Sequence, residues 1–330
     1  MALSRRDFFK YSALGLAGSA LSGAAAKASA STFGRYGLFP AGAAGGPSLA
    51  EGNAPTPLVM GLQLYSVRTD MEKDPLATLK QLSAMGYRNV EHANYVNGKF
   101  YGYAPTEFKK ILDDLGLGMH SGHTRFGADD WNETRKDFTD VWKQTVSDAA
   151  TVGQQYVISP WLDDQYRKSF DTLVAYMEIF NKNGELCKKS GLKFGYHNHN
   201  FEFSTHFNGM TMYEIILTHT DPALVAQQID IGNMYGAGGN AMDLLKKYPG
   251  RFELMHVKDE IKSIAPDNMD GYESTVIGAG VMQTRAIADL GRKIGITRHF
   301  IIEQESYQDK TALDSARIDL GVMKKWGYQV

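Results

Sequence analysis

The chain of 330 residues is poor in cysteine and has no excess of charge of one sign. Its single cysteine, Cys187, excludes an internal disulfide and any zinc or iron–sulfur site built from several cysteines. The 35 Lys and Arg residues nearly balance the 37 Asp and Glu residues, which disfavours nucleic acid or an anionic membrane as a partner. With 43% apolar and 22% charged residues, the composition is that of a folded chain. A small neutral ligand fits these numbers, and the nine histidines are the candidate metal ligands.

The first thirty residues resemble a twin-arginine export signal. The pair Arg5-Arg6 is followed by two phenylalanines and Lys10, a weakly apolar stretch covers 11–26, and residues 28–30 read Ala-Ser-Ala. That stretch is shorter than the ~20 apolar residues that span a bilayer, so we expect no stable membrane anchor. The alternatives are a short amphipathic helix and a transmembrane anchor. The export reading predicts the twin-arginine machinery as a partner and a periplasmic or otherwise exported protein.

The segment after the signal is expected to be a linker. Residues 31–57 are rich in Gly, Ala and Pro, above all from Ala41 to Pro57. Removal of residues 1–30 takes away four basic residues and one acidic residue, which moves the net charge from -2 to -5. The folded domain is then expected to cover 58–330.

From Leu58 onward, short apolar runs alternate with amphipathic stretches, a pattern typical of βα units around a parallel sheet. The expected strands are 58–65, 89–92, 118–123, 156–159, 193–197, 226–230, 253–257 and 299–303. The expected helices are 75–85, 108–115, 134–150, 169–189, 212–219, 242–248, 284–293 and 312–326. This alternation over about 270 residues predicts an α/β fold, a single-domain (β/α)8 TIM barrel. An open doubly wound sheet is the alternative, but no G-x-G-x-x-G follows an early strand.

Ionisable or amide side chains stand at the ends of seven of the eight expected strands. A buried unpaired charge costs several kcal/mol, so polar strand ends indicate a site, and the carboxyl ends of barrel strands converge on one face. These residues are Gln63, Arg68, Glu91, His92, His120, His123, His197, His199, Asp230, Asn233, His256, Lys258, Glu303 and Glu305.

A divalent ion needs three or four imidazole or carboxylate groups from different strands. The last four expected strands supply one each, namely His197, Asp230, His256 and Glu303. The fifth-strand position stays open between His197, His199 on the same face, and Glu202 just beyond.

Six segments are similar to those of the xylose isomerase-like TIM barrels, the sugar phosphate isomerase/epimerase superfamily. They are Gly61-Leu-Gln-Leu-Tyr-Ser, Tyr196-His-Asn-His-Asn-Phe-Glu-Phe, Ile229-Asp-Ile-Gly-Asn, Met255-His-Val-Lys-Asp, Ile277-Gly-Ala-Gly and Ile301-Ile-Glu-Gln. The resemblance covers residues 58–330 and implies one divalent ion, Mn2+, Co2+, Mg2+ or Zn2+, held by Glu, Asp, His and Glu. The last three correspond to Asp230, His256 and Glu303. His197 stands where the family's epimerases have a glutamate, so a ligand is kept while a carboxylate base is lost.

The resemblance implies proton abstraction α to a carbonyl whose oxygen is bound by the ion. The expected base is Glu303, and the imidazole of His197 can also serve as a general base near neutral pH. We expect Lys258 and His123 to polarise the oxygen or to protonate a leaving group; the alternatives are a salt-bridged rim lysine and a core histidine. The expected substrate contacts are Tyr65, Glu91, His199, Glu202, Trp161 and Asn233.

Four functions follow from these features. The first is a metal-dependent isomerase or epimerase of an unphosphorylated sugar, keto-sugar or glycoside, since the chain shows no glycine-rich phosphate loop. The second is a lyase or hydratase of 3-keto-glycosides, which needs one base and one acid. The third is an exported sugar-binding protein without catalysis. The fourth, an endonuclease of the same superfamily, is disfavoured by the net charge of -5 and by too few extra metal ligands.

Overall fold

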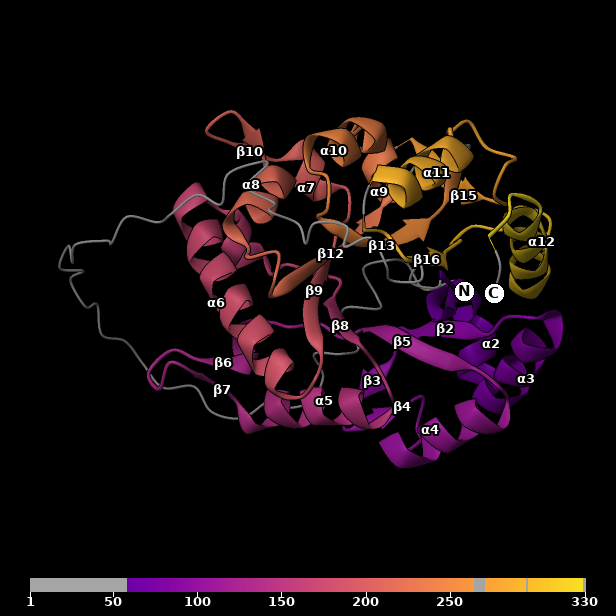
Figure 1. The fold of residues 1–330 in the computed structure, drawn as a ribbon, viewed down its shortest axis with the longest axis horizontal. Coiled ribbons are helices and arrows are strands. Elements are labelled where there is room, and N and C mark those ends of the chain that lie inside the picture. Colours follow the sequence, from indigo (N-terminus) through magenta and orange to yellow (C-terminus); the bar gives the residue numbers. More distant parts are fainter. Residues whose placement is uncertain (1–57, 264–270, 295, 329–330) are drawn as a thin grey trace, which may run out of the picture. The chain divides into compact units, whose positions relative to one another are not determined.

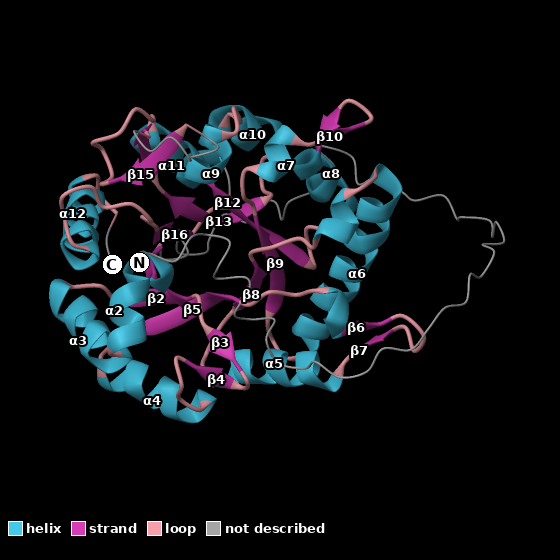
Figure 2. Cartoon of the chain, turned by 180° about the vertical axis from the view of Figure 1, so that it is seen from behind, coloured by secondary structure: helices cyan, strands magenta, loops and turns pink. Residues whose placement is uncertain are grey.

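The computed structural model describes residues 58–263, 271–294 and 296–328, so the expected signal and linker lie outside the described residues. Eight parallel strands close into a barrel with helices around it (Figures 1 and 2), which confirms the predicted TIM barrel. In barrel order the strands are β1 (Val59–Gln63), β16 (His299–Ile302), β13 (Phe252–Val257), β12 (Val225–Asp230), β9 (Lys193–His197), β8 (Tyr156–Ser159), β5 (Gly118–His123) and β2 (Asn89–His92).

The main helices follow the strands, as the alternation predicts. They are α3 (Pro75–Met85), α4 (Pro105–Asp114), α5 (Asp140–Thr151), α6 (Phe170–Lys189), α8 (Met212–His219), α10 (Ala241–Lys247), α11 (Thr284–Ile294) and α12 (Ala312–Lys325). Helix α3 shows why the sequence marks these bounds: the Asp74 carboxylate accepts the Ala77 N–H at 2.9 Å, and Gly86 ends the helix at φ 103°. Within the described part of the chain, no helix has the length and apolarity to cross a membrane.

Short elements fill the connections between strands and helices. They are the helices α2 (Arg68–Lys73), α7 (Phe201–Ser204) and α9 (Ile231–Gly236), the 3-10 turns η1 (Leu64–Val67), η2 (Ala128–Asp130) and η3 (Asp164–Arg167), and the strand pairs β3 (Tyr95–Val96) with β4 (Lys99–Phe100), β6 (Trp131–Asn132) with β7 (Asp137–Phe138), β10 (His206–Phe207) with β11 (Met210–Thr211) and β14 (Asp259–Lys262) with β15 (Tyr272–Thr275). The first strand is therefore shorter than predicted, because η1 begins at Leu64.

The helix predicted over 134–150 begins only at Asp140. The β6–β7 hairpin occupies its first part, and Lys136 in the turn has φ 51°, a conformation that no helix interior accommodates. The helix starts where the Thr139 hydroxyl accepts the N–H of Trp142 at 3.3 Å. The prediction of the start was therefore wrong, while the predicted end differs by one residue.

The apolar core has two parts, and the smaller one explains where the site lies. A large cluster packs between the sheet and the helices, whereas Ile158, Ala226 and Leu254 form a separate cluster with Tyr156 packed against it. Ala226 lies on the same strand face as Asp230, and Leu254 on the same face as His256, so this small cluster fills the barrel interior. Beyond it, toward the carboxyl ends of the strands, the interior is polar.

Candidate metal centre at the carboxyl ends of the strands

The four predicted ligands lie together. One ligand atom each of His197, Asp230, His256 and Glu303 lies within 4.8 Å of the others, and all four side chains are buried. Nδ1 of His256 lies 2.9 Å from Oε2 of Glu303 and 3.7 Å from Oδ2 of Asp230. Nε2 of His197 lies 3.7 Å from the same Asp230 oxygen. Four donors thus converge at one point. Three of them come from the strands β9, β12 and β13, and the fourth belongs to the residue that follows β16.

The donor set fits a divalent cation. Two imidazoles and two carboxylates form the mixed nitrogen and oxygen set that first-row divalent metals accept. The buried carboxylates also draw in a cation, because Nζ of Lys258 lies 3.0 Å from Asp230, 2.9 Å from Glu303 and 2.8 Å from Glu305. His197, Asp230, His256 and Glu303 would hold the ion, with Lys258 beside it.

Electrostatics assign different protonation states to these groups. Burial opposes ionisation of Glu303, but the positive charges of Lys258 and His256 hold its pKa well below the usual value. Burial likewise disfavours a charged His256, yet Glu303 and Glu91 raise its pKa well above the usual value. Burial holds the pKa of His197 well below its usual value, and the neighbouring His256 and His123 lower it further. His197 is therefore neutral and offers a lone pair, while Glu303 is ionised.

Glu91 lies beneath this centre and has no exposed surface. Its Oε1 accepts hydrogen bonds from Nε2 of His256 at 2.6 Å and from Nε2 of Gln63 at 2.8 Å. Its Oε2 accepts from Nε2 of Gln228 at 2.8 Å and from the Ser121 hydroxyl. Burial would raise the pKa of Glu91, but His123 and His256 lower it to about 2. The structure thus places this predicted substrate contact behind the candidate ligand His256.

Sequence reasoning missed Gln228 and Ser121. Gln228 stands two residues before Asp230 on the same strand face, so the period of two could have found it. Ser121 carried no such signal, because the register shifts between Asn89 and Glu91 where β2 pairs with β5.

Two further predicted residues support ligands. Nδ2 of Asn233 donates to Oδ2 of Asp230 at 3.1 Å, and the Asn233 N–H donates to Oδ1 at 2.8 Å. His123 stacks on His256 with ring centroids 5.1 Å apart, and its Nε2 lies 2.7 Å from Oε1 of Gln228. One nitrogen each of His123, His197 and His256 also lies within 4.8 Å of the others.

Three other predicted substrate contacts, His199, Trp161 and Tyr65, take part in contacts that involve their rings. The His199 ring lies 5.2 Å from that of His197 and 5.4 Å from that of Trp161, so aromatic side chains extend outward from the centre. Tyr65 lies in η1 beside β1, with the Arg68 guanidinium 4.6 Å from its ring.

Glu202 is fully buried and bonds to the Tyr196 hydroxyl and, at 3.0 Å, to the N–H of His199. Its carboxylate thus contacts the backbone of His199, whose ring lies beside that of the candidate ligand His197. Burial raises its pKa to about 7.

Two strand-end histidines lie away from the centre. His92 packs edge-on against Phe100, with ring centroids 4.9 Å apart, and neither of its nitrogens has a partner among the residues that the structure describes. The His120 ring lies 5.8 Å from that of His299, which begins β16, so it faces the amino ends of the strands. The expectation that both belong to the site is wrong.

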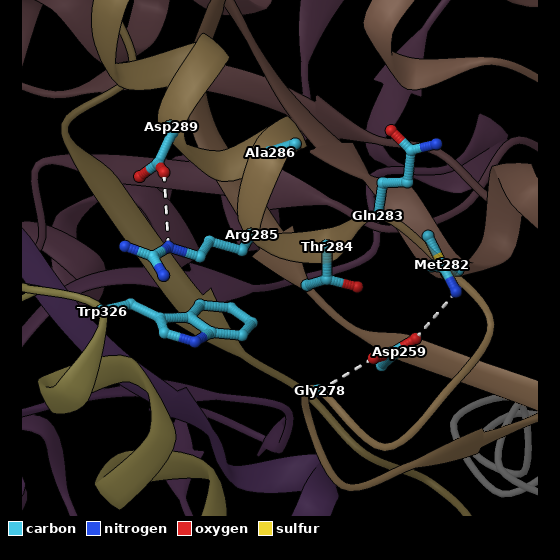
Figure 3. Close-up of a pocket in the computed structure, with 9 residues that line it drawn as sticks. All are labelled: Asp259, Gly278, Met282, Gln283, Thr284, Arg285, Ala286, Asp289 and Trp326. Carbon is cyan, nitrogen blue, oxygen red and sulfur yellow. Dashed lines mark hydrogen bonds and ion pairs between the residues drawn. The ribbon is translucent and has the colours of Figure 1, made fainter.

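A separate hollow of about 350 Å³ lies between the start of α11 and Trp326 (Figure 3). None of the four candidate ligands lines it. Its Asp259 carboxylate accepts the N–H groups of Gly278 at 2.8 Å and of Gly280 and Met282 at 3.2 Å. Asp259 therefore holds the loop before α11, and its negative charge opposes an anion there.

The chain is similar to curated dehydratases over part of its length. The chain is 28% identical over 182 residues to an inosose dehydratase of Bacillus licheniformis, which is 51% of this chain and 60% of that protein. It is 31% identical over 101 residues to an inosose dehydratase of Clostridium perfringens, 31% of this chain and 33% of that protein. The matches thus span between a third and three fifths of these curated relatives.

A solved sugar phosphate isomerase/epimerase from Parabacteroides distasonis is similar over most of its length. It superposes with a TM-score of 0.69 and 26% identity, covering 86% of this chain and 98% of that one. The zinc-bound IolI protein shares the fold, with a TM-score of 0.62 at 14% identity, over 82% of this chain and 99% of that one. Residues 79–326 match the family model of the xylose isomerase-like TIM barrel, and the chain belongs to this family.

Proposed function

We propose that the protein is a divalent-metal-dependent lyase that removes water or an alcohol from a keto-sugar or an oxidised glycoside. The observation that carries this proposal is the asymmetry of the centre. One ionised carboxylate, Glu303, lies 2.9 Å from the Lys258 ammonium, and the candidate ligand from β9 is neutral His197 and not a second carboxylate base. One base beside one acid is what an elimination needs.

A bound ion would polarise the substrate carbonyl and acidify the neighbouring C–H bond. Glu303 takes this proton, and the electron pair left on carbon forms the new C=C bond. The adjacent C–O bond breaks, its electron pair leaves with oxygen, and a proton from Nζ of Lys258 completes water or an alcohol. Asp230 and Glu305, at 3.0 and 2.8 Å from Nζ, hold the ammonium in place for this transfer.

The relatives support a lyase, since two of them are inosose dehydratases. An epimerase is the second candidate, favoured by the 26% identity to the isomerase/epimerase over 86% of this chain. An epimerase must return a proton to the opposite face of the substrate, and His197 would have to do so. The lone pair of His197 Nε2 is directed at the ligand cluster, 3.7 Å from Asp230, so ligation would remove it as a base.

The test is incubation of the metal-loaded protein with a 3-keto-glycoside in deuterium oxide. A lyase releases the aglycone alcohol or water and forms an unsaturated ketone, which is seen by ultraviolet absorption. An epimerase incorporates deuterium while every C–O bond stays intact. If neither deuterium uptake nor C–O cleavage occurs, the result indicates a binding protein.

Glu303→Gln should abolish whichever reaction occurs. The control is Glu253→Gln, a carboxylate on the same barrel whose partners, Tyr156 and Lys193, lie away from the centre. Activity retained in Glu303→Gln would contradict the assignment of the base.

A further inference from the structure

Both histidine ligands are connected to the same buried carboxylate through their inner ring nitrogens. An imidazole binds a metal only through an unprotonated nitrogen, so the proton must sit on the other one. A hydrogen bond to that other nitrogen decides where the proton sits. The partners of the inner nitrogens of His197 and His256 therefore determine whether the centre can form.

For His256 the partner is direct. Nε2 lies 2.6 Å from Oε1 of Glu91, and a carboxylate oxygen only accepts, so Nε2 carries a proton. The opposite nitrogen, Nδ1, faces Glu303 at 2.9 Å and Asp230 at 3.7 Å. Nδ1 is thus the atom that can face an ion.

For His197 the connection passes through Gln228. The amide atom that lies 2.8 Å from Glu91 must be the NH2 group, because the carboxylate only accepts. The amide oxygen then faces Nδ1 of His197 at 3.0 Å and can only accept, so Nδ1 is protonated. Nε2 of His197, on the side of Asp230, is left with its lone pair.

Glu91 itself is held at both of its oxygens. Gln63 donates to one of its oxygens and Ser121 to the other, and the side chain is completely buried. We infer that Glu91 is a positioning residue that sets the proton pattern of both histidine ligands, His256 directly and His197 through Gln228. This inference rests on the metal centre of the proposed function, and not on the reaction.

The first experiment measures metal affinity with a competing chelator and Zn2+. Glu91→Gln keeps the size of the side chain but can place a donor against His256, so the Kd for Zn2+ should rise about 10- to 100-fold. Gln228→Leu leaves the bond between Glu91 and His256 in place and removes the connection to His197, together with the contact to His123, so its Kd should rise less. The matched control is Asp319→Asn, a buried carboxyl of α12 that accepts the Ile277 N–H at 2.8 Å and is not one of the candidate ligands. Circular dichroism checks that each variant folds.

The second experiment locates the protons by NMR of 15N-histidine-labelled protein. In wild type, His197 should carry its proton on Nδ1 with and without Zn2+, and His256 should keep its Nε2 proton when Zn2+ is bound. In Glu91→Gln the amide of Gln228 is no longer oriented by a charge, so the Nδ1 proton of His197 should shift partly to Nε2.

The outcomes separate this inference from the proposed reaction. A Kd in Glu91→Gln equal to that of Asp319→Asn, or a wild-type His197 protonated on Nε2, would overturn the role of Glu91. If Glu91→Gln loses affinity for Zn2+ while the wild type, loaded with metal, does not turn over keto-glycosides, the proposed reaction alone is refuted. Failure of the wild type to bind Zn2+ would refute both the metal centre and the inference.

Discussion

Replacement of Glu202 by Gln should change how the stability of the protein depends on pH. Glu202 is completely buried, and burial raises its pKa from 4.5 to about 7 although the Tyr196 hydroxyl and the His199 N–H favour the charged form. In the unfolded chain the carboxyl has its ordinary pKa. Between these two values the folded protein keeps a proton that the unfolded chain has lost, so stability falls as the pH rises through this window.

The size of the effect follows from the two pKa values. Each pKa unit is worth about 1.4 kcal/mol, so ionisation of Glu202 lowers the free energy of unfolding by about 3 kcal/mol in all. About 2.5 kcal/mol of this loss in the free energy of unfolding occurs between roughly pH 5 and pH 8. A glutamine does not ionise, and the variant should lack this loss.

The assay is urea unfolding of wild type and Glu202→Gln at several pH values over this range, with a chelator present. The free energy of unfolding of the variant minus that of wild type should rise by about 2.5 kcal/mol across the range. Glu178→Gln, on the exposed face of α6, measures the effect of the same substitution at the surface. A difference that stays constant with pH would mean that folded Glu202 ionises as it does in the unfolded chain, and would refute the reasoning.

Four other predictions concern packing, capping, the ligands and export. Gly184→Ala should lower the free energy of unfolding by about 1–3 kcal/mol, because a Cβ there lies 2.5 Å from the Leu224 carbonyl oxygen. The control is Gly321→Ala in α12, which should not destabilise the protein because nothing lies within 4 Å of the added Cβ. Asp74→Ala removes the cap of α3 and should cost about 1 kcal/mol in urea unfolding, while no change would contradict the capping role. Asp230→Asn should weaken Zn2+ binding more than Glu91→Gln in the chelator competition, and equal affinity with wild type would contradict the ligand set. Replacement of Arg5 and Arg6 by Lys should block export in cell fractionation, and unchanged export would refute the twin-arginine signal.

The barrel strands were predictable because they are buried on both faces. Such strands tend to be short apolar runs, as in β8, Tyr156-Val-Ile-Ser. The strands β2, β5 and β9 also have the predicted bounds, although β2 and β5 contain few apolar residues. Helix α3 was equally clear, since Asp74, Pro75 and Gly86 mark both of its ends. The β6–β7 hairpin was not predictable from the sequence, because its turn depends on the positive φ of Lys136, and lysine has no strong preference for turns.

The convergence of the four candidate ligands was predictable for a topological reason. In a barrel all strands run in parallel, so the last inward residue of each strand reaches the same end. His197, Asp230 and His256 are such residues, and Glu303 directly follows β16. Their convergence follows once the number and order of the strands are known.

The sequence by itself therefore determined the fold, the end of the barrel that carries the centre, and the residue types that meet there. Only the tertiary structure decided what lies behind them. The register of β2 against β5 shifts by one residue, so Glu91 lies opposite Ser121 and not opposite His120. Such a shift is set by packing around the whole barrel and leaves no local mark in the sequence. It gives Glu91 the partners that hold it under His256, while His120 lies near His299.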